Sequence, residues 1–270
     1  MESQKYPVQL TYYRMKNLTK IFFLISVIAL FLTSCSNDKD DKGKVFVKII
    51  ETTENDVVEN SVFKYQENQI ISAENSKQRI DYTYANGLIS RIVTYDKDSE
   101  SSVVLEFSYE NEKLVQLTSS ENYSIYYSYN SDGTVSYEKF NGMTKSEAQK
   151  VYHGTLSFKN KNLIKDERLF DVLDENQTVS IKISYDYDTF NNPYYSILGY
   201  DKLLNQGALV SKNNMVQAVS ETTVTEGEGT ISSANIYKIT YKYDADNYPV
   251  EQVSEVSLTN PNYSKIQYLY

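Results

Sequence analysis

The sequence predicts an all-β protein: an antiparallel meander of repeated hairpins that curls into an open barrel or half-barrel, with at most one short helix. Three observations support this class. Tyrosine is abundant, with 26 residues against 10 Phe and no Trp, and it favours half-buried strands. Aromatic side chains alternate with polar ones at the strand period of two. Asn, Asp and Gly recur between these strands, where hairpin turns need them.

A repeated unit accounts for most of the chain. Each copy has an alternating aromatic strand, a polar turn and a second strand that opens with apolar residues. The clearest copy is Tyr82-Thr83-Tyr84, the turn Asn86-Gly87, and then Leu88 to Ile92. Asn-Gly supplies the positive φ that a two-residue hairpin turn requires. Further copies have their turns at Asn68, Asn111, Asp132-Gly133, Asn162 and Asp246-Asn247, with a half-copy at Asn214 to Val219.

A single hairpin is not stable alone, so neighbouring copies are expected to pair into one continuous sheet. The sequence leaves little room for helix. Thr144 to Tyr152 is the best candidate, because Thr144 and Glu147 form a capping-box pattern. Tyr200 to Asn214 is predicted to be a long loop or an irregular insertion.

Three segments precede the repeat domain, which we place at residues 45–270. Residues 15–34 have the layout of a lipoprotein signal peptide, with a charged start, an apolar stretch and Leu32-Thr33-Ser34 before Cys35. Residues 1–14 are interpreted as a non-native extension from an early start codon, so Met1 and Met15 are both candidate starts. Residues 35–44 form a short acidic tether that is expected to be flexible.

Cys35 is the single cysteine of the chain, so it cannot form an internal disulfide. We expect it to become the first residue of the mature protein and to carry lipid acyl chains such as palmitate. The membrane is then a partner through this lipid anchor. The acidic tether resembles the surface-export signal of Bacteroidota lipoproteins. This favours the cell surface over the periplasmic face of the outer membrane. A net charge of -9 argues against nucleic acid as a partner.

The hairpin unit resembles a degenerate form of the YD repeats of Rhs-type proteins. Asn192-Pro193-Tyr194, Ser211 to Asn214 and Tyr241 to Pro249 together resemble a family of Bacteroidota lipoproteins with a porin-like fold. The chain departs from that family in having Asn247 where Gly is usual before Tyr-Pro. The resemblance implies extracytoplasmic β structure and implies no particular activity.

No catalytic constellation is found, and we expect neither an enzyme nor a cofactor or metal. His153 is the only histidine, so a histidine-rich metal site is excluded. Three Asp pairs have one residue between partners, but a Ca²⁺ loop also needs a Gly and a distal Glu, so they are interpreted as turn residues. These pairs are Asp96/Asp98, Asp186/Asp188 and Asp244/Asp246.

The predicted function is therefore that of an anchored binding or scaffold module for a glycan or a protein. The alternative is an extracytoplasmic glycan-active enzyme, which would need a deep cleft with two facing carboxylates. The tyrosine rows are expected to form the core of the sheet rather than a stacking platform for sugars. A membrane-spanning barrel is disfavoured, because outward strand positions carry many Lys, Glu and Gln side chains.

Overall fold

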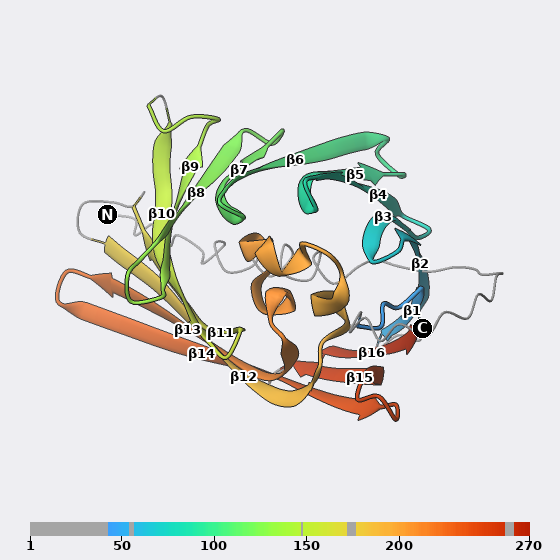
Figure 1. Ribbon diagram of the computed structural model, residues 1–270. Helices are drawn as coiled ribbons and strands as arrows, with labels where there is room; N and C mark the ends of the chain where they lie inside the picture. The colour runs from blue at the N-terminus through green and yellow to red at the C-terminus, as the bar shows by residue number, and fades with distance from the viewer. Residues whose placement is uncertain (1–42, 54–56, 147, 172–176, 257–261) are drawn as a thin grey trace.

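The computed structural model describes residues 43–53, 57–146, 148–171, 177–256 and 262–270. In these residues sixteen strands form one closed antiparallel barrel, in which each strand pairs with its neighbours in sequence and β1 pairs with β16 (Figure 1). The signal peptide, Cys35 and most of the tether predicted from the sequence lie outside the described residues.

The first eight strands are β1 (Lys48–Thr53), β2 (Val58–Gln66), β3 (Gln69–Glu74), β4 (Gln78–Ala85), β5 (Leu88–Asp96), β6 (Ser101–Glu110), β7 (Lys113–Ser119) and β8 (Tyr123–Tyr129). The remaining strands are β9 (Val135–Asn141), β10 (Gln149–Lys159), β11 (Asn162–Phe170), β12 (Gln177–Asn191), β13 (Asn213–Glu226), β14 (Gly229–Tyr243), β15 (Pro249–Val256) and β16 (Asn262–Leu269). Three short 3-10 helices lie between β12 and β13: η1 (Pro193–Ser196), η2 (Tyr200–Lys202) and η3 (Leu204–Val210).

The all-β meander predicted from the sequence is confirmed, with one correction: the barrel is closed rather than open. β1 pairs with β16 along its whole length, from Lys48 opposite Leu269 to Thr53 opposite Ser264. Within this seam Ile49 lies opposite Tyr268, and both side chains are buried. Closure joins strands from the two ends of the domain, and no local sequence pattern records such a long-range pairing.

The helix expected at Thr144 to Tyr152 is not seen in the described residues: Thr144 to Ser146 lie in a turn, and Gln149 to Tyr152 belong to a strand. Gln149–Lys159 form β10, which pairs with β9 and β11. The ring of Tyr152 packs edge-on against Tyr137 on β9, with 6.1 Å between ring centroids. Sheet pairing thus overrides the capping-box pattern at Thr144. The insertion expected at Tyr200 to Asn214 is irregular as far as Lys212 and contains η2 and η3.

The repeated turns all lie at one end of the barrel, because a meander returns to the same end at every second connection. We call this end, with turns at 67–68, 86–87, 111–112, 130–134, 160–161 and 244–248, the turn end, and the opposite end the loop end. Asn86, Asn111 and Asn160 have positive φ, as do the residues that follow them. This is the backbone of the type I′ turn that the sequence predicts.

A β-bulge lies beside most of these turns. It adds one residue to a strand and so interrupts the strict alternation of inward and outward side chains. In the clearest copy Tyr84 pairs with Ile89 and Thr83 pairs with Arg91, so Ser90 is the extra residue. Four other hairpins have the same irregularity just before the second aromatic position, at Lys64/Tyr65, Ser108/Tyr109, Ser157/Phe158 and Lys242/Tyr243.

Tyrosine hydroxyls bind backbone groups near these bulges. The Tyr84 hydroxyl accepts a hydrogen bond from the backbone N–H of Ile70 at 3.1 Å. The Tyr109 hydroxyl donates to the carbonyl of Ile89 at 2.8 Å, and the Tyr187 hydroxyl donates to that of Leu163 at 2.6 Å. In each case the tyrosine belongs to one hairpin and the backbone group to the hairpin before it. Buried backbone groups require such partners, which explains tyrosine rather than phenylalanine here.

The apolar core lies inside the barrel, whereas the solvent-exposed ion pairs lie on its outer face. Buried side chains on the inner face include Phe63, Ile89 and Leu117, and they belong to one continuous apolar cluster. On the outer face, ion pairs such as Arg79–Asp81 are solvent-exposed. Among the described residues, the helices are too short and too polar to span a bilayer.

Candidate binding site

Residues 192–212, which we call the plug, fold into the barrel at the turn end (Figure 1). Asn192 organises its start: the side-chain oxygen accepts from the N–H of Tyr194, and the side-chain amide donates to the carbonyls of Leu209 and Ser211. Backbone bonds then join the plug to the turns. Leu198 donates to the carbonyl of Asn68 at 2.9 Å, and Lys212 donates to that of Lys161 at 3.0 Å.

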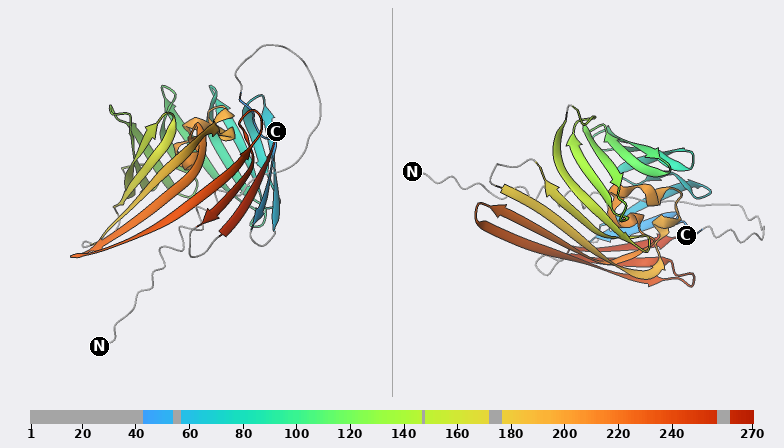
Figure 2. Two further views of the ribbon diagram at one scale, coloured as in Figure 1. Left: turned by 90° about the horizontal axis from the view of Figure 1, so that it is seen from below. Right: turned by 60° about the vertical axis from the view of Figure 1, so that its left-hand side comes forward.

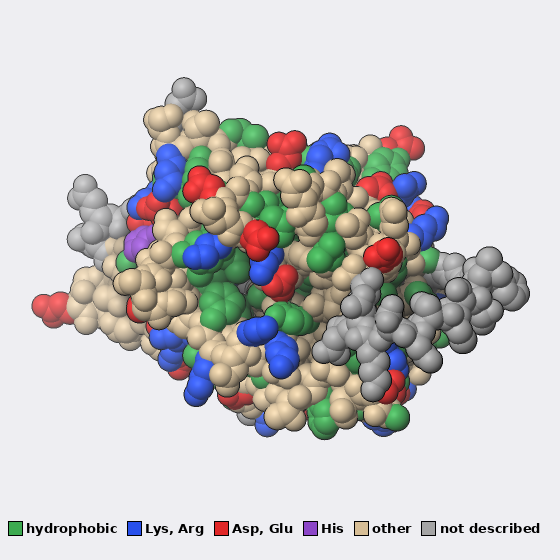
Figure 3. Space-filling model, in the orientation of Figure 1, with side chains coloured by type: hydrophobic (Ala, Val, Ile, Leu, Met, Phe, Trp, Pro, Cys, Tyr) green, Lys and Arg blue, Asp and Glu red, His purple; other side chains and the backbone are tan. Residues whose placement is uncertain are grey.

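Apolar contacts hold the plug in place. Ile197, Tyr200 and Leu203 are all buried in the barrel core. Gly199 has a φ of 72°, and a Cβ there would lie 3.1 Å from the carbonyl oxygen of Gly87, so the plug meets the β4–β5 turn where no side chain fits. Viewed along the barrel, side chains cover most of the centre (Figure 3). The lumen at the turn end is therefore filled with protein.

The N-terminal part of the described chain completes this filling. Phe46 is fully buried, and its ring lies 4.3 Å from that of Phe63 and 5.0 Å from that of Tyr194, centroid to centroid. Lys44 forms ion pairs with both Asp244 and Asp246, the first at 2.8 Å. The chain thus enters the barrel at the turn end, beside the plug.

A charged cluster lies within the barrel on β9 to β11. The Tyr137 hydroxyl donates to a carboxylate oxygen of Asp166 at 2.5 Å and accepts from Nε of Arg168 at 2.9 Å, while Arg168 also pairs with Asp166. Burial raises the pKa of Tyr137, so its hydroxyl stays protonated. Gly154 leaves room for this ring, because a Cβ there would lie 2.6 Å from it. The charges satisfy each other, so the cluster joins strands rather than offering a free charge.

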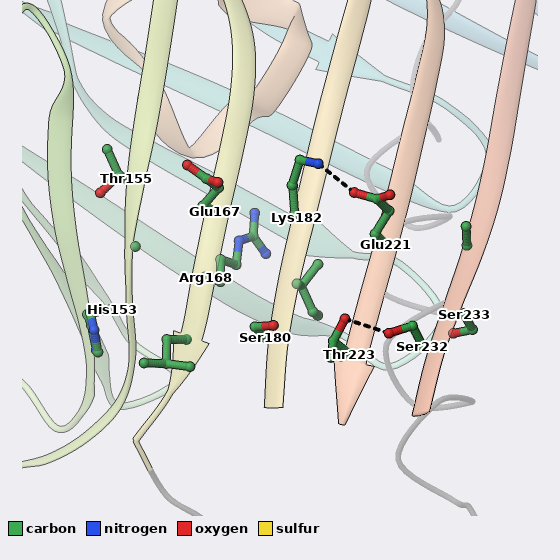
Figure 4. A pocket seen from close by; sticks show the side chains of 14 residues that line it. His153, Thr155, Glu167, Arg168, Ser180, Lys182, Glu221, Thr223, Ser232 and Ser233 are labelled. Carbon is green, nitrogen blue, oxygen red and sulfur yellow. Dashed lines mark hydrogen bonds and ion pairs between the residues drawn. The ribbon is translucent and has the colours of Figure 1, made fainter. Parts of the chain in front are cut away.

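A hollow of about 600 Å³ lies on the outer face of β10 to β14, and we call it the outer groove (Figure 4). The Lys182 ammonium and the Glu221 carboxylate cross it as an ion pair at 2.7 Å. The hydroxyls of Thr223 and Ser232 lie 3.0 Å apart. The lining comprises His153, Gly154, Thr155, Glu167, Arg168, Leu169, Ser180, Ile181, Lys182, Glu221, Thr223, Ser232, Ser233 and Ala234.

A second hollow of about 240 Å³ adjoins the outer groove across β8 to β10 and shares His153, Gly154 and Thr155 with it. His153 stands between the two, with Nδ1 2.9 Å from a carboxylate oxygen of Asp171. Hydroxyls, a carboxylate–ammonium pair and an imidazole can donate and accept hydrogen bonds along a polar ligand. The outer groove has no Phe, Tyr or Trp ring in its lining, so it favours hydrogen bonding over stacking.

The Asp pairs predicted from the sequence lie apart from one another. Asp96 accepts from the backbone of Asp98 and Ser99, and Asp244 accepts from Asp246 and Tyr248, so both shape turns. Asp188 instead accepts from Asn214 on β13 and Tyr243 on β14, so it joins β12 to these two strands rather than shaping a turn. Within the part of the chain that the structure describes, no three His, Cys, Asp or Glu side chains are grouped for a metal ion.

The structure also brings together two acids that the sequence analysis did not identify. Glu51 on β1 lies opposite Glu59 on β2, and both are buried. Burial raises the pKa of Glu51, although a hydrogen bond from Ser264 opposes the rise. Glu51 lies two residues after Ile49, so strand alternation places both side chains on the same face of β1. An acid on the same face as a core residue is a signal that could have identified this pair. Neither acid lines the outer groove.

Comparisons with known proteins support the fold alone. No family model matches the sequence, and no curated protein matches it. A porin-like protein from Bacteroides vulgatus ATCC 8482 has a similar structure, with a TM-score of 0.52 and 16% identity over 84% of this chain and 99% of that one. A porin-like protein from Bacteroides uniformis ATCC 8492 has a TM-score of 0.49 and 10% identity over 83% of this chain and 96% of that one.

Proposed function

We propose that this protein is a binding or scaffold module held at the outer membrane by a lipid on Cys35, with the outer groove as its binding surface. One observation carries the proposal: at the turn end the barrel has an apolar interior filled by the plug, while its outer face carries exposed charged side chains. A barrel that crosses a membrane has the opposite arrangement, an apolar outer band around a polar interior.

The outer face makes a lipid-embedded wall costly. Lys64, Arg79 and Lys182 are exposed on three different strands that span the barrel. In such a barrel a lipid-facing Arg or Lys costs from about 0–1 kcal/mol near the membrane interfaces to about 2–4 kcal/mol at the bilayer midplane. A wall with these residues faces water, and attachment to the membrane then needs a separate anchor.

The tether sets which end lies near that membrane. The described chain starts at Gly43, eight positions after Cys35, and the next residue, Lys44, is paired with Asp244 and Asp246 at the turn end. A fully extended chain of that length spans roughly 26–29 Å. The turn end therefore lies close to the lipid, and the loop end, with the outer groove near it, points away.

Membrane release tests the anchor. Full-length wild type should label with a palmitate analogue and stay with the outer membrane, whereas Cys35→Ala should be unlabelled and pass into buffer without detergent. A Cys35→Ala protein that resists alkaline extraction from the membrane would contradict the proposal. Protease added to intact and to permeabilised cells distinguishes the cell surface from the periplasmic face.

Paired variants test the outer groove. We expect binding of polysaccharides or proteins, measured by calorimetry with the full-length Cys35→Ala chain, to weaken when Lys182 and Glu221 are both changed to Ala. The matched control changes Arg79 and Asp81, an exposed ion pair on β4 outside the groove. Equal binding by both double variants would exclude the groove. The alternative role as a glycan-active enzyme is less favoured, because Glu51 and Glu59 are buried in the wall rather than in an open cleft.

A further inference from the structure

One stretch of β14 has a strand on only one side. β14 pairs with β13 over Gln217 to Glu226, but its pairing with β15 ends where Tyr237 meets Val256. Within the described residues, nothing pairs with the other side of Gly229–Ile236, which we call the free edge. Alternate residues of such an edge direct their N–H and C=O groups outward.

The free edge belongs to a tongue, formed by residues 177–184 of β12, 219–226 of β13 and 229–236 of β14. Figure 2 shows the tongue extending beyond the rest of the barrel wall. All eight residues of the free edge are exposed, and Ile231 is 76% exposed, although its position in the alternation is on the inner face. Neither face of this edge is covered by the barrel.

The free edge lacks the features that keep edges from pairing. Native edge strands are blunted by charged residues, proline or bulges. The sequence Gly-Thr-Ile-Ser-Ser-Ala-Asn-Ile has no charge and no proline, in a chain with a net charge of -9. Its register with β13 is regular from Gln217 to Glu226. The edge is therefore competent to accept another strand by backbone hydrogen bonding.

Charge identifies the strand that fits. The tip of the tongue is acidic, with Glu226 and Glu228, and the opposite end of the free edge is followed by Lys238. Two copies aligned antiparallel place the acidic tip of each beside the lysine of the other. We propose that the free edge of β14 pairs with the same edge of a second copy of this chain, related by a two-fold axis near Ser232 or Ser233.

In this dimer the two tongues form one continuous sheet across both protomers. A two-fold axis requires that the interface be self-complementary, and an antiparallel strand pair satisfies that condition. The outer groove includes Ser232 to Ala234 in its lining, so the grooves of the two copies adjoin across the axis. Dimerisation is independent of the binding role, because it needs only the edge.

Cysteine scanning tests the pairing directly. Residues opposite each other in antiparallel strands have Cα atoms about 4.5–5.5 Å apart, which suits a disulfide. On the full-length Cys35→Ala chain we expect an intermolecular disulfide to form best at one position, Ser232→Cys or Ser233→Cys. Glu106→Cys is the control, because Glu106 is exposed on β6 but is paired with Arg91 on β5 and with Thr118 on β7. Equal cross-linking at all three positions would overturn the proposal.

Charge changes supply a second test, read by sedimentation velocity over a concentration series. Ala234→Lys should weaken dimerisation at least about tenfold by placing like charges near each other, whereas Thr240→Lys, on the same face of β14 but paired with β15, should not. Glu228→Lys and Lys238→Glu should each weaken the dimer, and the double variant should restore it. A wild-type chain that stays monomeric throughout the series would disprove the dimer.

Discussion

The turn end and the tongue lie at opposite ends of β12 to β14, and they differ in nearly every physical respect. At the turn end, short turns of fixed geometry, the plug and the N-terminal segment bury each other, and side chains satisfy backbone groups. In the tongue, Ile231 and its neighbours are exposed on both faces. The contrast teaches that strand length alone does not give stability. The strands are stabilised where the plug and the N-terminal segment pack against their inner face.

The largest expected effect separates these two regions. Phe46→Ala should cost about 3–5 kcal/mol of unfolding free energy, because it empties a fully buried ring site shared by the barrel wall and the plug. Ile231→Ala, in the exposed tongue, should change that free energy by less than about 0.5 kcal/mol. Urea denaturation at a protein concentration too low for dimerisation compares them. Similar losses in both variants would remove the distinction between the regions.

The charged cluster inside the barrel should give the next largest effect. Asp166→Ala leaves Arg168 without its carboxylate and should cost about 2 kcal/mol, less than for a fully buried pair because Arg168 partly reaches solvent. Arg79 and Asp81 form the exposed comparison, and Asp81→Ala should cost less than about 1 kcal/mol. Thermal melts at matched pH rank the two. A smaller loss for Asp166→Ala than for Asp81→Ala would refute the assigned role.

Two tyrosines test the role of the hydroxyls. Tyr84→Phe should cost about 1 kcal/mol, because its hydroxyl bonds Ile70 and Leu198. Burial raises the pKa of Tyr84 to about 12, so the hydroxyl remains a donor at neutral pH. The hydroxyl of Tyr65 is buried without a partner in the described structure, so Tyr65→Phe should be neutral or stabilising. A loss of equal size in both would show that the hydrogen bonds are not the cause.

The smallest effect depends on pH. Burial raises the pKa of Glu51 in the folded protein, and the nearby Glu59 adds to the increase. The favourable contribution of this group is therefore full below its unfolded pKa and is lost as pH rises through the folded pKa. Glu51→Gln should stabilise the protein slightly at neutral pH and leave it unchanged in acid. Denaturation at several pH values measures the difference, and a gain that persists in acid would contradict this cause.

Much of the wall could be predicted from the sequence, because its signals are local. The Asn86-Gly87 turn and the alternation around Tyr82 and Tyr84 depend on residues within one hairpin. Closure of the barrel and the strand at Gln149–Lys159 depend on partners elsewhere in the chain, and no local pattern encodes them. The plug was recognisable only as an interruption of the repeat.

The candidate site was harder to predict for the same reason. The outer groove combines His153, Lys182 and Ser232 from three hairpins, and each is an ordinary outward residue of its own strand. His153 was identified because it is unique, not because its pattern indicated a site. The free edge of β14 arises from the unequal lengths of β14 and β15, which no turn signal reveals.

The tyrosine hydroxyls also link some hairpins to the hairpin that follows them in the chain. Tyr84 follows Ile70 in the chain, and Tyr109 follows Ile89, so each hairpin receives a hydrogen-bonding partner from the hairpin made after it. These hairpins are completed by their successors, so a chain truncated just after Ile70 or Ile89 would end in a hairpin that lacks one of its native hydrogen bonds.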